Sequence, residues 1–283
     1  MKPRLQRRVQ RYGWDKAADC YEELWGRQIE PSRRLLLERA ALQPGEHVLD
    51  VACGSGLVTF PAADRVGPGG RVLGTDLSDE MVRRSSGEAS RRGLAHVSFE
   101  RMDAEELGVA DASFDAVLCA LGLMYVPDPV TACREMARVL RPGGRAVVAV
   151  WGERRRCGWA DIFPIVDGRV NTDVCPLFFR LGTGDTLRFE MEAAGWEDVR
   201  LERIDATLEY ADADEAVSAA FRGGPVALAY DRFDEATRAS AHAEYLESIA
   251  PFRRNGSGYA IPGEFVVATA YRAGQGTKSS ANE

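Results

Sequence analysis

Two glycines and one carboxylate have the residue types and the spacing of a ligand site. Gly54 and Gly56 come directly after an apolar run, within the stretch HVLDVACGSGLVTF at residues 47–60. Glycine leaves the backbone open to a ligand, and a helix that begins after it offers free N–H groups to an anion. Asp76 ends the next apolar run, GRVLGTD, where a carboxylate can accept hydrogen bonds from both hydroxyls of a ribose. We therefore expect a nucleotide-type cofactor, although an ordinary strand-to-helix turn, with Asp76 capping the helix that begins at Ser78, would give the same pattern.

The end of the glycine stretch helps to distinguish this site from that of a dinucleotide oxidoreductase, which has the same arrangement of strand, glycine loop and acidic residue. The fingerprint of that class has a third glycine, which allows close packing of helix on strand. In GSGLVT that position holds Thr59. The difference argues against NAD or FAD, and an NAD-linked oxidoreductase is kept as an alternative.

A parallel sheet would bring these residues to one edge, and residues 46–151 have the pattern of such a sheet. Apolar runs of strand length alternate there with helical stretches; the runs are HVLDVA, RVLGTD, HVSFER, FDAVLCAL and RAVVAVW. Alternation of this kind implies parallel strands joined by right-handed helical crossovers. We expect an α/β fold with a doubly wound, mostly parallel sheet and helices on both of its faces.

The segments on either side of this alternation divide the chain further. We expect residues 1–44 to be a helical segment whose basic start, MKPRLQRRVQR, is frayed and solvated. The core of the cofactor-binding domain is assigned to residues 45–210 and 261–272. Residues 211–260 are predicted to form a helical cap inserted before the last strand, either a substrate lid or a packing extension. The polar tail at 273–283 is predicted to be disordered.

Composition narrows the classes of partner. A net charge of −7 argues against a nucleic acid, whose phosphates attract clustered Lys and Arg. We find no apolar stretch long enough to span a membrane. The six cysteines form no CxxC pair and the three histidines lie far apart in the sequence. Reduced thiols in a cytoplasmic protein, and no metal site, are the simplest expectation.

Five motifs, in this order along the chain, resemble those of a known family. VLDVACGSG, GTDLS, MDAEEL, FDAVLCALGLMYVPD and LRPGGRAVVAVWG are similar to the motifs of class I S-adenosylmethionine-dependent methyltransferases. The likeness is greatest to the branch of the ubiquinone and menaquinone C-methyltransferases (methyltransferase type 11), and it covers residues 45–152. The resemblance implies a Rossmann-like fold with seven strands and S-adenosyl-L-methionine as the cofactor. It carries almost no information about the methyl acceptor.

The resemblance also implies which residues contact the cofactor. Those expected are Asp50, Ala52, Cys53, Gly54 and Gly56 around the methionine part, Asp76 on the ribose, Leu77, Met81, Asp103 and Ala104 around adenine, Cys119 on the sulfonium side, and Tyr21 closing over the whole. Ala52 stands where the family usually has glycine. Simpler interpretations exist: Asp103 with Glu106 fits the N-cap of a short helix, and the apolar and aromatic residues fit plain core packing.

No catalytic base stands out in the sequence. Tyr125, Tyr230 and His242 are candidates, although His242 fits a solvated helix face more simply. Methyl transfer is an in-line displacement in which the cofactor brings the activated methyl group, so the protein chiefly aligns the reactants and excludes water. The lack of a base favours an electron-rich acceptor, such as a phenolate, an amine or an enolate-like carbon.

We therefore expect a methyltransferase that acts on O, N or C of a small organic molecule, such as a quinone-, polyketide- or other natural-product-like compound. A protein of the same fold with non-methylating chemistry or a sensor role is an alternative. The sequence leaves open whether the chain forms a homodimer.

Overall fold

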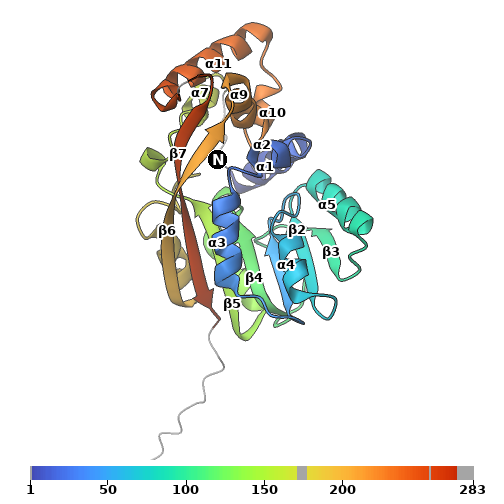
Figure 1. The fold of residues 1–283 in the computed structure, drawn as a ribbon. Helices are drawn as coiled ribbons and strands as arrows, with labels where there is room; N and C mark the ends of the chain where they lie inside the picture. The colour runs from blue at the N-terminus through green and yellow to red at the C-terminus, as the bar shows by residue number, and fades with distance from the viewer. Residues whose placement is uncertain (1, 171–176, 255, 273–283) are drawn as a thin grey trace, which may run out of the picture.

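Seven strands of the described chain form one sheet; they are β1 (His47–Val51), β2 (Arg71–Asp76), β3 (Val97–Arg101), β4 (Phe114–Ala120), β5 (Leu140–Trp151), β6 (Glu197–Tyr210) and β7 (Tyr259–Tyr271). The computed structural model describes residues 2–170, 177–254 and 256–272. The strand order is β3-β2-β1-β4-β5-β7-β6 (Figure 1). The first five strands are parallel, whereas β7 runs antiparallel to both β5 and β6. The predicted seven-stranded, mostly parallel sheet is confirmed.

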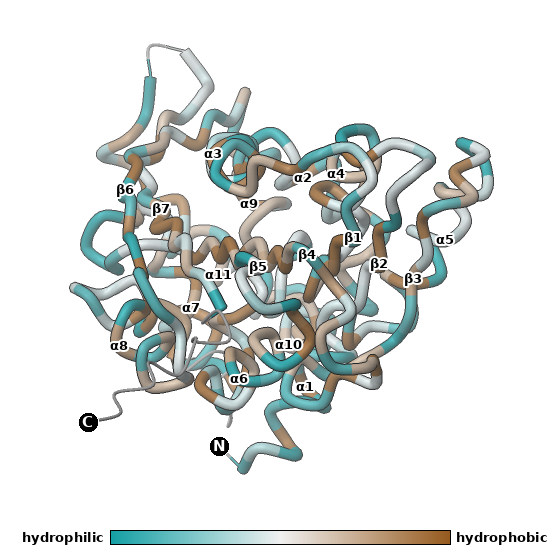
Figure 2. The backbone as a smooth tube through the Cα atoms, turned by 90° about the horizontal axis from the view of Figure 1, so that it is seen from below, coloured by the Kyte–Doolittle hydropathy of each residue, from teal (hydrophilic) through white to brown (hydrophobic). Residues whose placement is uncertain are grey.

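Helices cover both faces of this sheet. The described helices of the chain up to β6 are α1 (Pro3–Ala17), α2 (Tyr21–Trp25), α3 (Glu30–Ala40), α4 (Thr59–Val66), α5 (Asp79–Arg92), α6 (Pro129–Val139), α7 (Ile162–Asp167) and α8 (Thr186–Ala193), with a 3-10 turn η1 (Leu123–Tyr125). Figure 2 shows α3 and α4 on one face and α6 and α8 on the other. Because both faces are covered, most residues of the central strands β1 and β4 and the second half of β5 are buried and apolar.

Local signals in the sequence explain where the crossover helices begin and end. The hydroxyl of Ser78 accepts a hydrogen bond from the Met81 N–H (3.1 Å), which caps the start of α5. Gly93 adopts a left-handed conformation at the end of that helix. The carboxylate of Asp128 caps α6 through the Thr131 N–H (3.1 Å). These caps fix the loops at the carboxyl ends of the strands, where the functional residues lie.

The insertion between β6 and β7 is helical, as predicted. It contains α9 (Ala213–Arg222), α10 (Ala227–Tyr230), α11 (Glu235–Ser248) and a short turn η3 (Ala250–Phe252). In Figure 1 these helices lie with α7 at the end of the molecule toward which β6 and β7 extend, next to α1 and α2. Whether they form a separate domain stays a prediction.

The basic N-terminus differs from the expectation of a frayed start. Residues 3–17 form α1, which begins at Pro3 and buries Gln6 and Gln10. Arg7 forms ion pairs with Asp103 and Glu105, and the side chain of Gln6 donates to the Tyr125 carbonyl (3.1 Å). The sequence suggested solvation because the first eleven residues are rich in charge. The acidic partners lie about a hundred residues away and could not be paired with them from sequence.

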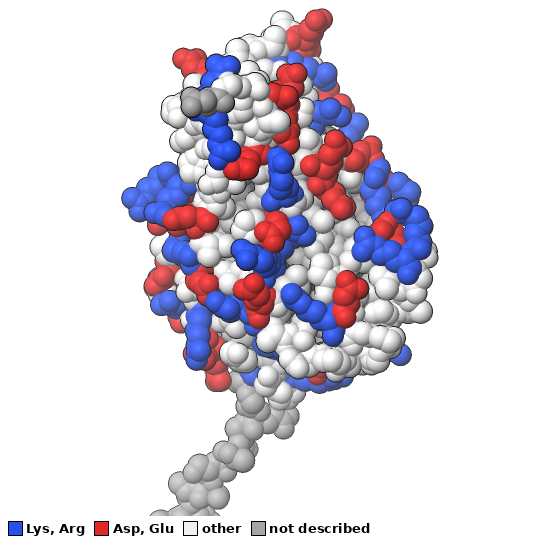
Figure 3. All heavy atoms as spheres, in the orientation of Figure 1, with Lys and Arg blue, Asp and Glu red and all other residues white. Residues whose placement is uncertain are grey.

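Charged side chains of both signs are interspersed over the surface. Figure 3 shows this for one face, and the arginines of α5 each pair with an acidic neighbour. No helix in the described ranges has the length and hydropathy to cross a bilayer. The five described cysteines are free thiols, and Cys175 lies outside the described residues.

Candidate functional site

The loop after β1 has an unusual backbone at three successive bends. Ala52, Gly54 and Gly56 have φ angles of +55°, +55° and +87°. A Cβ on Gly56 would lie 2.5 Å from the ring of Phe60, so this glycine lets helix α4 pack closely. A Cβ on Gly54 would meet nothing closer than Tyr21, at 3.7 Å. Gly54 therefore presents a bare backbone toward open space, as a ligand-binding loop requires.

Asp76, at the end of β2, holds this loop in place. One carboxylate oxygen accepts a hydrogen bond from the Gly54 N–H (2.8 Å), and the other accepts from the Ser78 N–H (2.9 Å). The helix α5 is capped by the Ser78 hydroxyl, so the simpler interpretation of Asp76 as its capping residue is wrong. Burial raises the pKa of Asp76, and the two backbone donors oppose that shift.

Asp50, near the end of β1, has one unused oxygen. Its Oδ2 accepts a hydrogen bond from the Thr59 hydroxyl (2.6 Å), while its Oδ1 is buried and has no hydrogen-bond partner among the described residues. Burial raises the pKa of Asp50 to about 7, although the Thr59 hydroxyl opposes the shift. A buried carboxylate oxygen without a donor is costly, and a cationic group in the cavity would satisfy it.

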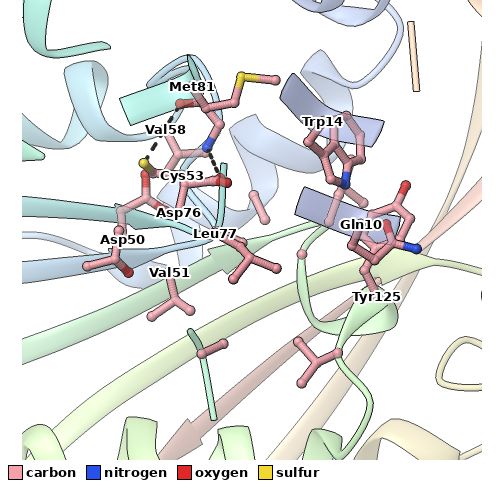
Figure 4. Close-up of a pocket in the computed structure, with 18 of the residues that line it drawn as sticks. Gln10, Trp14, Asp50, Val51, Cys53, Val58, Asp76, Leu77, Met81 and Tyr125 are labelled. Atoms are coloured by element: carbon pink, nitrogen blue, oxygen red, sulfur yellow. Dashed lines mark hydrogen bonds between the residues drawn. The ribbon is translucent and has the colours of Figure 1, made fainter. Parts of the chain in front are cut away.

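These residues line one cavity with about 980 Å³ of empty space, part of it open to solvent (Figure 4). The expected contact residues that line it are Tyr21, Asp50, Ala52, Cys53, Gly54, Asp76, Leu77, Met81, Asp103 and Ala104. Gly56 and Cys119 are not among the lining residues: the first packs on Phe60, and the second is 1% exposed within β4. Burial raises the pKa of the Cys119 thiol to about 12, which keeps it neutral.

Helices α1 and α3 contribute lining residues that sequence reasoning missed. Figure 4 shows Gln10 and Trp14 of α1, with Tyr125, opposite Asp50 and Asp76. Arg33 of α3 also lines the cavity, and its guanidinium donates to the carbonyls of Leu57 (3.1 Å) and Gly26 (2.7 Å). Burial lowers the pKa of Arg33. The guanidinium nevertheless remains a cation at neutral pH. Little in the sequence indicates this role, because Arg33 is one of three arginines in α3.

Asp103 lies in a turn instead of at the start of a helix. Its Oδ1 accepts from the Glu105 N–H (3.0 Å), and residues 103 and 106 form an isolated bridge. The interpretation of Asp103 as a helix N-cap was wrong, because no helix follows it and its carboxylate pairs with Arg7 (2.6 Å). The carboxylate remains at the rim of the cavity, under α1.

A second, aromatic chamber adjoins the first cavity and has about 500 Å³ of empty space. The two share the residues Trp14, Tyr21, Ile29, Leu121 and Tyr125. The chamber is further lined by Trp25, Met124, Trp151, Trp159, Ile162, Phe163, Phe178, Ala220 of α9 and residues 223–226 between α9 and α10. We call the first space the cofactor cavity and the second the aromatic chamber.

The three candidate catalytic residues lie in two different places. Tyr125 stands where the two spaces meet. Tyr230 and His242 lie in α10 and α11, where the Tyr230 hydroxyl and His242 Nε2 are 2.9 Å apart. Neither lines the cofactor cavity or the aromatic chamber, and burial lowers the pKa of His242. Their contacts are those of a packed pair within the helical insertion.

Comparison with known proteins points to one family. Residues 49–148 match a family model described as a methyltransferase domain. The chain is 40% identical over 132 residues to nocamycin O-methyltransferase of Saccharothrix syringae, covering 47% of each protein. It is 40% identical over 121 residues to the ubiquinone/menaquinone biosynthesis C-methyltransferase UbiE of Bdellovibrio bacteriovorus, covering 43% of this chain and 51% of that one. The chain thus spans about half the length of these curated relatives.

A solved structure extends the likeness to most of the fold. Phosphoethanolamine N-methyltransferase 2 of Haemonchus contortus, in complex with S-adenosyl-L-methionine, superposes with a TM-score of 0.61 at 17% identity. The match covers 92% of this chain and 57% of that one. At this identity the likeness concerns the fold alone, which is the Rossmann-like α/β fold.

Proposed function

We propose, from the match of residues 49–148 to a methyltransferase-domain family, that the chain transfers a methyl group from S-adenosylmethionine to a small organic acceptor. The observation that carries the proposal is the meeting of three carboxylates in one cavity. Asp50, Asp76 and Asp103 come from the ends of β1, β2 and β3, and all three line the cofactor cavity. The carboxyl edge of a parallel sheet is where this fold binds its ligand.

The described residues fit S-adenosylmethionine part by part. Asp76 can accept hydrogen bonds from the ribose hydroxyls while it braces Gly54, because each carboxylate oxygen has more than one acceptor site. Leu77 and Met81 would lie against adenine, and Asp103 would accept from its amino group. The bare backbone of Gly54 would lie beside the methionine part.

Two opposite charges suit the amino-acid end of the cofactor. The unpaired Oδ1 of Asp50 would accept a hydrogen bond from its ammonium group. The guanidinium of Arg33 would pair with its carboxylate, because both side chains line the same cavity. A cofactor without an amino-acid end would leave the buried Oδ1 of Asp50 without a hydrogen-bond donor in the described part of the chain.

The protein's part in catalysis is alignment. The cofactor supplies an activated methyl group, and the residues shared by the two spaces form the junction where an acceptor can approach it. The junction is built from Trp14, Tyr21, Ile29, Leu121 and Tyr125, side chains that exclude water. The unpaired thiols of the described cysteines fit the cytoplasm, the location that we propose.

Calorimetry with cofactor fragments tests the assignment. We expect S-adenosylmethionine and S-adenosylhomocysteine to bind, and NADH not to bind. Arg33→Met should weaken S-adenosylhomocysteine by about tenfold, since a charge-assisted hydrogen bond contributes about 1.5–3 kcal/mol, but should leave methylthioadenosine unchanged because it lacks the amino-acid end. Asp76→Asn should weaken both ligands, and Arg34→Met, an exposed arginine of the same helix, should weaken neither.

Other results would point elsewhere. Selective binding of NADH would favour the oxidoreductase. Tight binding of S-adenosylmethionine with no methylation of any acceptor would favour non-methylating chemistry or a sensor. Equal loss of both adenosine ligands in Arg33→Met would remove the proposed role of that residue.

A further inference from the structure

The walls of the aromatic chamber carry no formal charge among the described lining residues. Three of the lining indoles pack against one another: the ring centroids of Trp151 and Trp159 are 4.8 Å apart, and those of Trp25 and Trp159 are 5.6 Å apart. A cationic or anionic ligand would lose its hydration there without gaining a counter-charge. A flat, uncharged ring would pack edge-to-face or offset against the indoles. The chamber therefore favours a neutral aromatic compound over an amine or a carboxylate.

Two glycines in the segment 223–226 differ in how much space surrounds them, and one of them borders the empty space of the chamber. A Cβ on Gly223 would lie 2.5 Å from the indole of Trp25, so that glycine is packed. Gly224 is also buried, yet a Cβ there would meet no atom within 4 Å. Gly224 lines the chamber, so the empty space beside it belongs to the chamber. Substitution at this position would fill that space without displacing a neighbour.

No described side chain of the chamber can accept a proton at neutral pH. Its titratable groups are the phenols of Tyr21 on α2 and Tyr125 in η1. No Asp, Glu, His, Lys, Arg or Cys is among the described residues that line it. Burial raises the pKa of Tyr21 well above its ordinary value, so its hydroxyl stays protonated. A proton on the acceptor must therefore leave without help from these walls.

We propose, resting on the proposed function above, that the aromatic chamber selects a neutral, flat ring that carries an acidic phenol or enol hydroxyl, and that the acidity of this hydroxyl replaces a protein base. The hydroxyl loses its proton to water. The resulting oxygen anion forms a bond to the methyl carbon as the carbon–sulfur bond breaks, and the electron pair of that bond stays on sulfur as a thioether. Atoms and charge balance without an oxidant, a reductant or a protein base.

The choice of acceptor tests the proposal at saturating S-adenosylmethionine. Three probes of similar ring size are 6-cyano-2-naphthol, a more acidic phenol that is still largely neutral at pH 7; β-naphthol, a weaker acid; and naphthylmethylamine, a cation at neutral pH. We expect methylation of the two hydroxyl compounds and not of the amine. The pH at which kcat/KM reaches its plateau should be lower for 6-cyano-2-naphthol than for β-naphthol by the difference between the two acidities, because the same enzyme is compared. A profile identical for both hydroxyl compounds, or methylation of the amine, overturns the proposal.

A variant that fills the chamber tests its location. Gly224→Leu should raise KM for β-naphthol by at least about tenfold, because leucine occupies the space of several ring atoms. Quenching of tryptophan fluorescence by β-naphthol, measured with S-adenosylhomocysteine bound, should weaken in parallel. Affinity for S-adenosylhomocysteine should stay within about twofold, since the two spaces are distinct. The matched control is Gly87→Leu, at an exposed position of α5 with equal room for a side chain.

The outcomes separate this proposal from the proposed function. If the unmodified protein binds no S-adenosylmethionine, the proposed function fails. If it binds S-adenosylmethionine and methylates amines, or if Gly224→Leu leaves the acceptor KM unchanged, only the proposal about the chamber fails. If the hydroxyl compounds are neither bound nor methylated by protein that binds the cofactor, the chamber is not their site.

Discussion

At the scale of single residues, the cofactor cavity depends on backbone groups that only a small residue can leave exposed. Gly54 has room for a Cβ but a positive φ, while Gly56 has both a positive φ and a ring against it. From the letters alone both glycines were assigned to the cofactor, because a strand followed by GxG does not say which glycine packs and which is bare. In the structure Gly56 packs against the ring of Phe60, whereas Gly54 leaves its backbone open toward the cavity.

A pair of substitutions separates strain from ligand contact. Gly54→Ala and Gly93→Ala both place alanine at a positive φ, +55° and +67°, and in both a Cβ finds no close contact. Each should lower stability by about 1–2 kcal/mol. Only Gly54→Ala should also weaken S-adenosylhomocysteine, because Gly93 lies outside the cofactor cavity. Chemical denaturation and calorimetry measure the two effects; equal affinity in both variants would contradict a ligand role for Gly54.

At the scale of elements, α1 is the part that sequence reasoning placed least well. Strands and crossover helices between 46 and 151 follow directly from apolar runs, caps and glycine stops, and there the predictions are confirmed. The packing of α1 over the cavity depends on pairs such as Arg7 with Asp103, which join distant parts of the chain. The aromatic chamber could not be predicted for the same reason. Its indoles come from separate segments of the chain (Trp25, Trp151 and Trp159), and each alone has the pattern of a core residue.

The ion pairs of Arg7 should slow the escape of the cofactor. Arg7→Met removes the pairs with Asp103 and Glu105 that hold α1 on the rim. Because partly exposed ion pairs contribute about 0.2–1 kcal/mol each, we expect dissociation of S-adenosylhomocysteine to become a few times faster. High salt should produce a similar change in the unmodified protein and little further change in the variant. Stopped-flow fluorescence measures the rate.

The control for this prediction lies one residue away. Arg8 is exposed, and Arg8→Met should leave the dissociation rate unchanged. If Arg7→Met and Arg8→Met behave alike, α1 does not retain the cofactor through these pairs.

At the scale of the whole molecule, the buried Asp50 should couple stability to pH. Its pKa is about 7 in the folded chain and 3.8 in an unperturbed carboxyl, so between these values the folded state holds a proton that the unfolded state has lost. The contribution of Asp50 to the free energy of unfolding therefore falls as pH rises from about 4 to 7. The cavity is formed at the expense of stability near neutral pH.

Removing the charge should remove that slope. The free energy of unfolding of Asp50→Asn, minus that of the unmodified protein, should rise by up to about 1.4 kcal/mol per pH unit across this range. Any cost of the amide that does not depend on pH shifts this difference by a constant and leaves its slope unchanged. Urea denaturation without cofactor at four pH values measures the difference. Curves that run parallel from pH 5 to 8 would show that Asp50 is ionised throughout. The same variant should bind S-adenosylhomocysteine more weakly, since its ammonium loses a carboxylate.

The close approach of the loops after β1 and β4 restricts the order in which substitutions in these loops can evolve. A Cβ on Gly122 would lie 2.3 Å from the Cβ of Ala52, so there is space for a single methyl group between them. Gly122→Ala should therefore unfold the loop on its own and become tolerable once Ala52 is replaced by glycine. A lineage that moves the methyl group from one loop to the other has to pass through an ancestor with glycine at both positions, and thermal denaturation of the two single variants and the double variant would reveal that order.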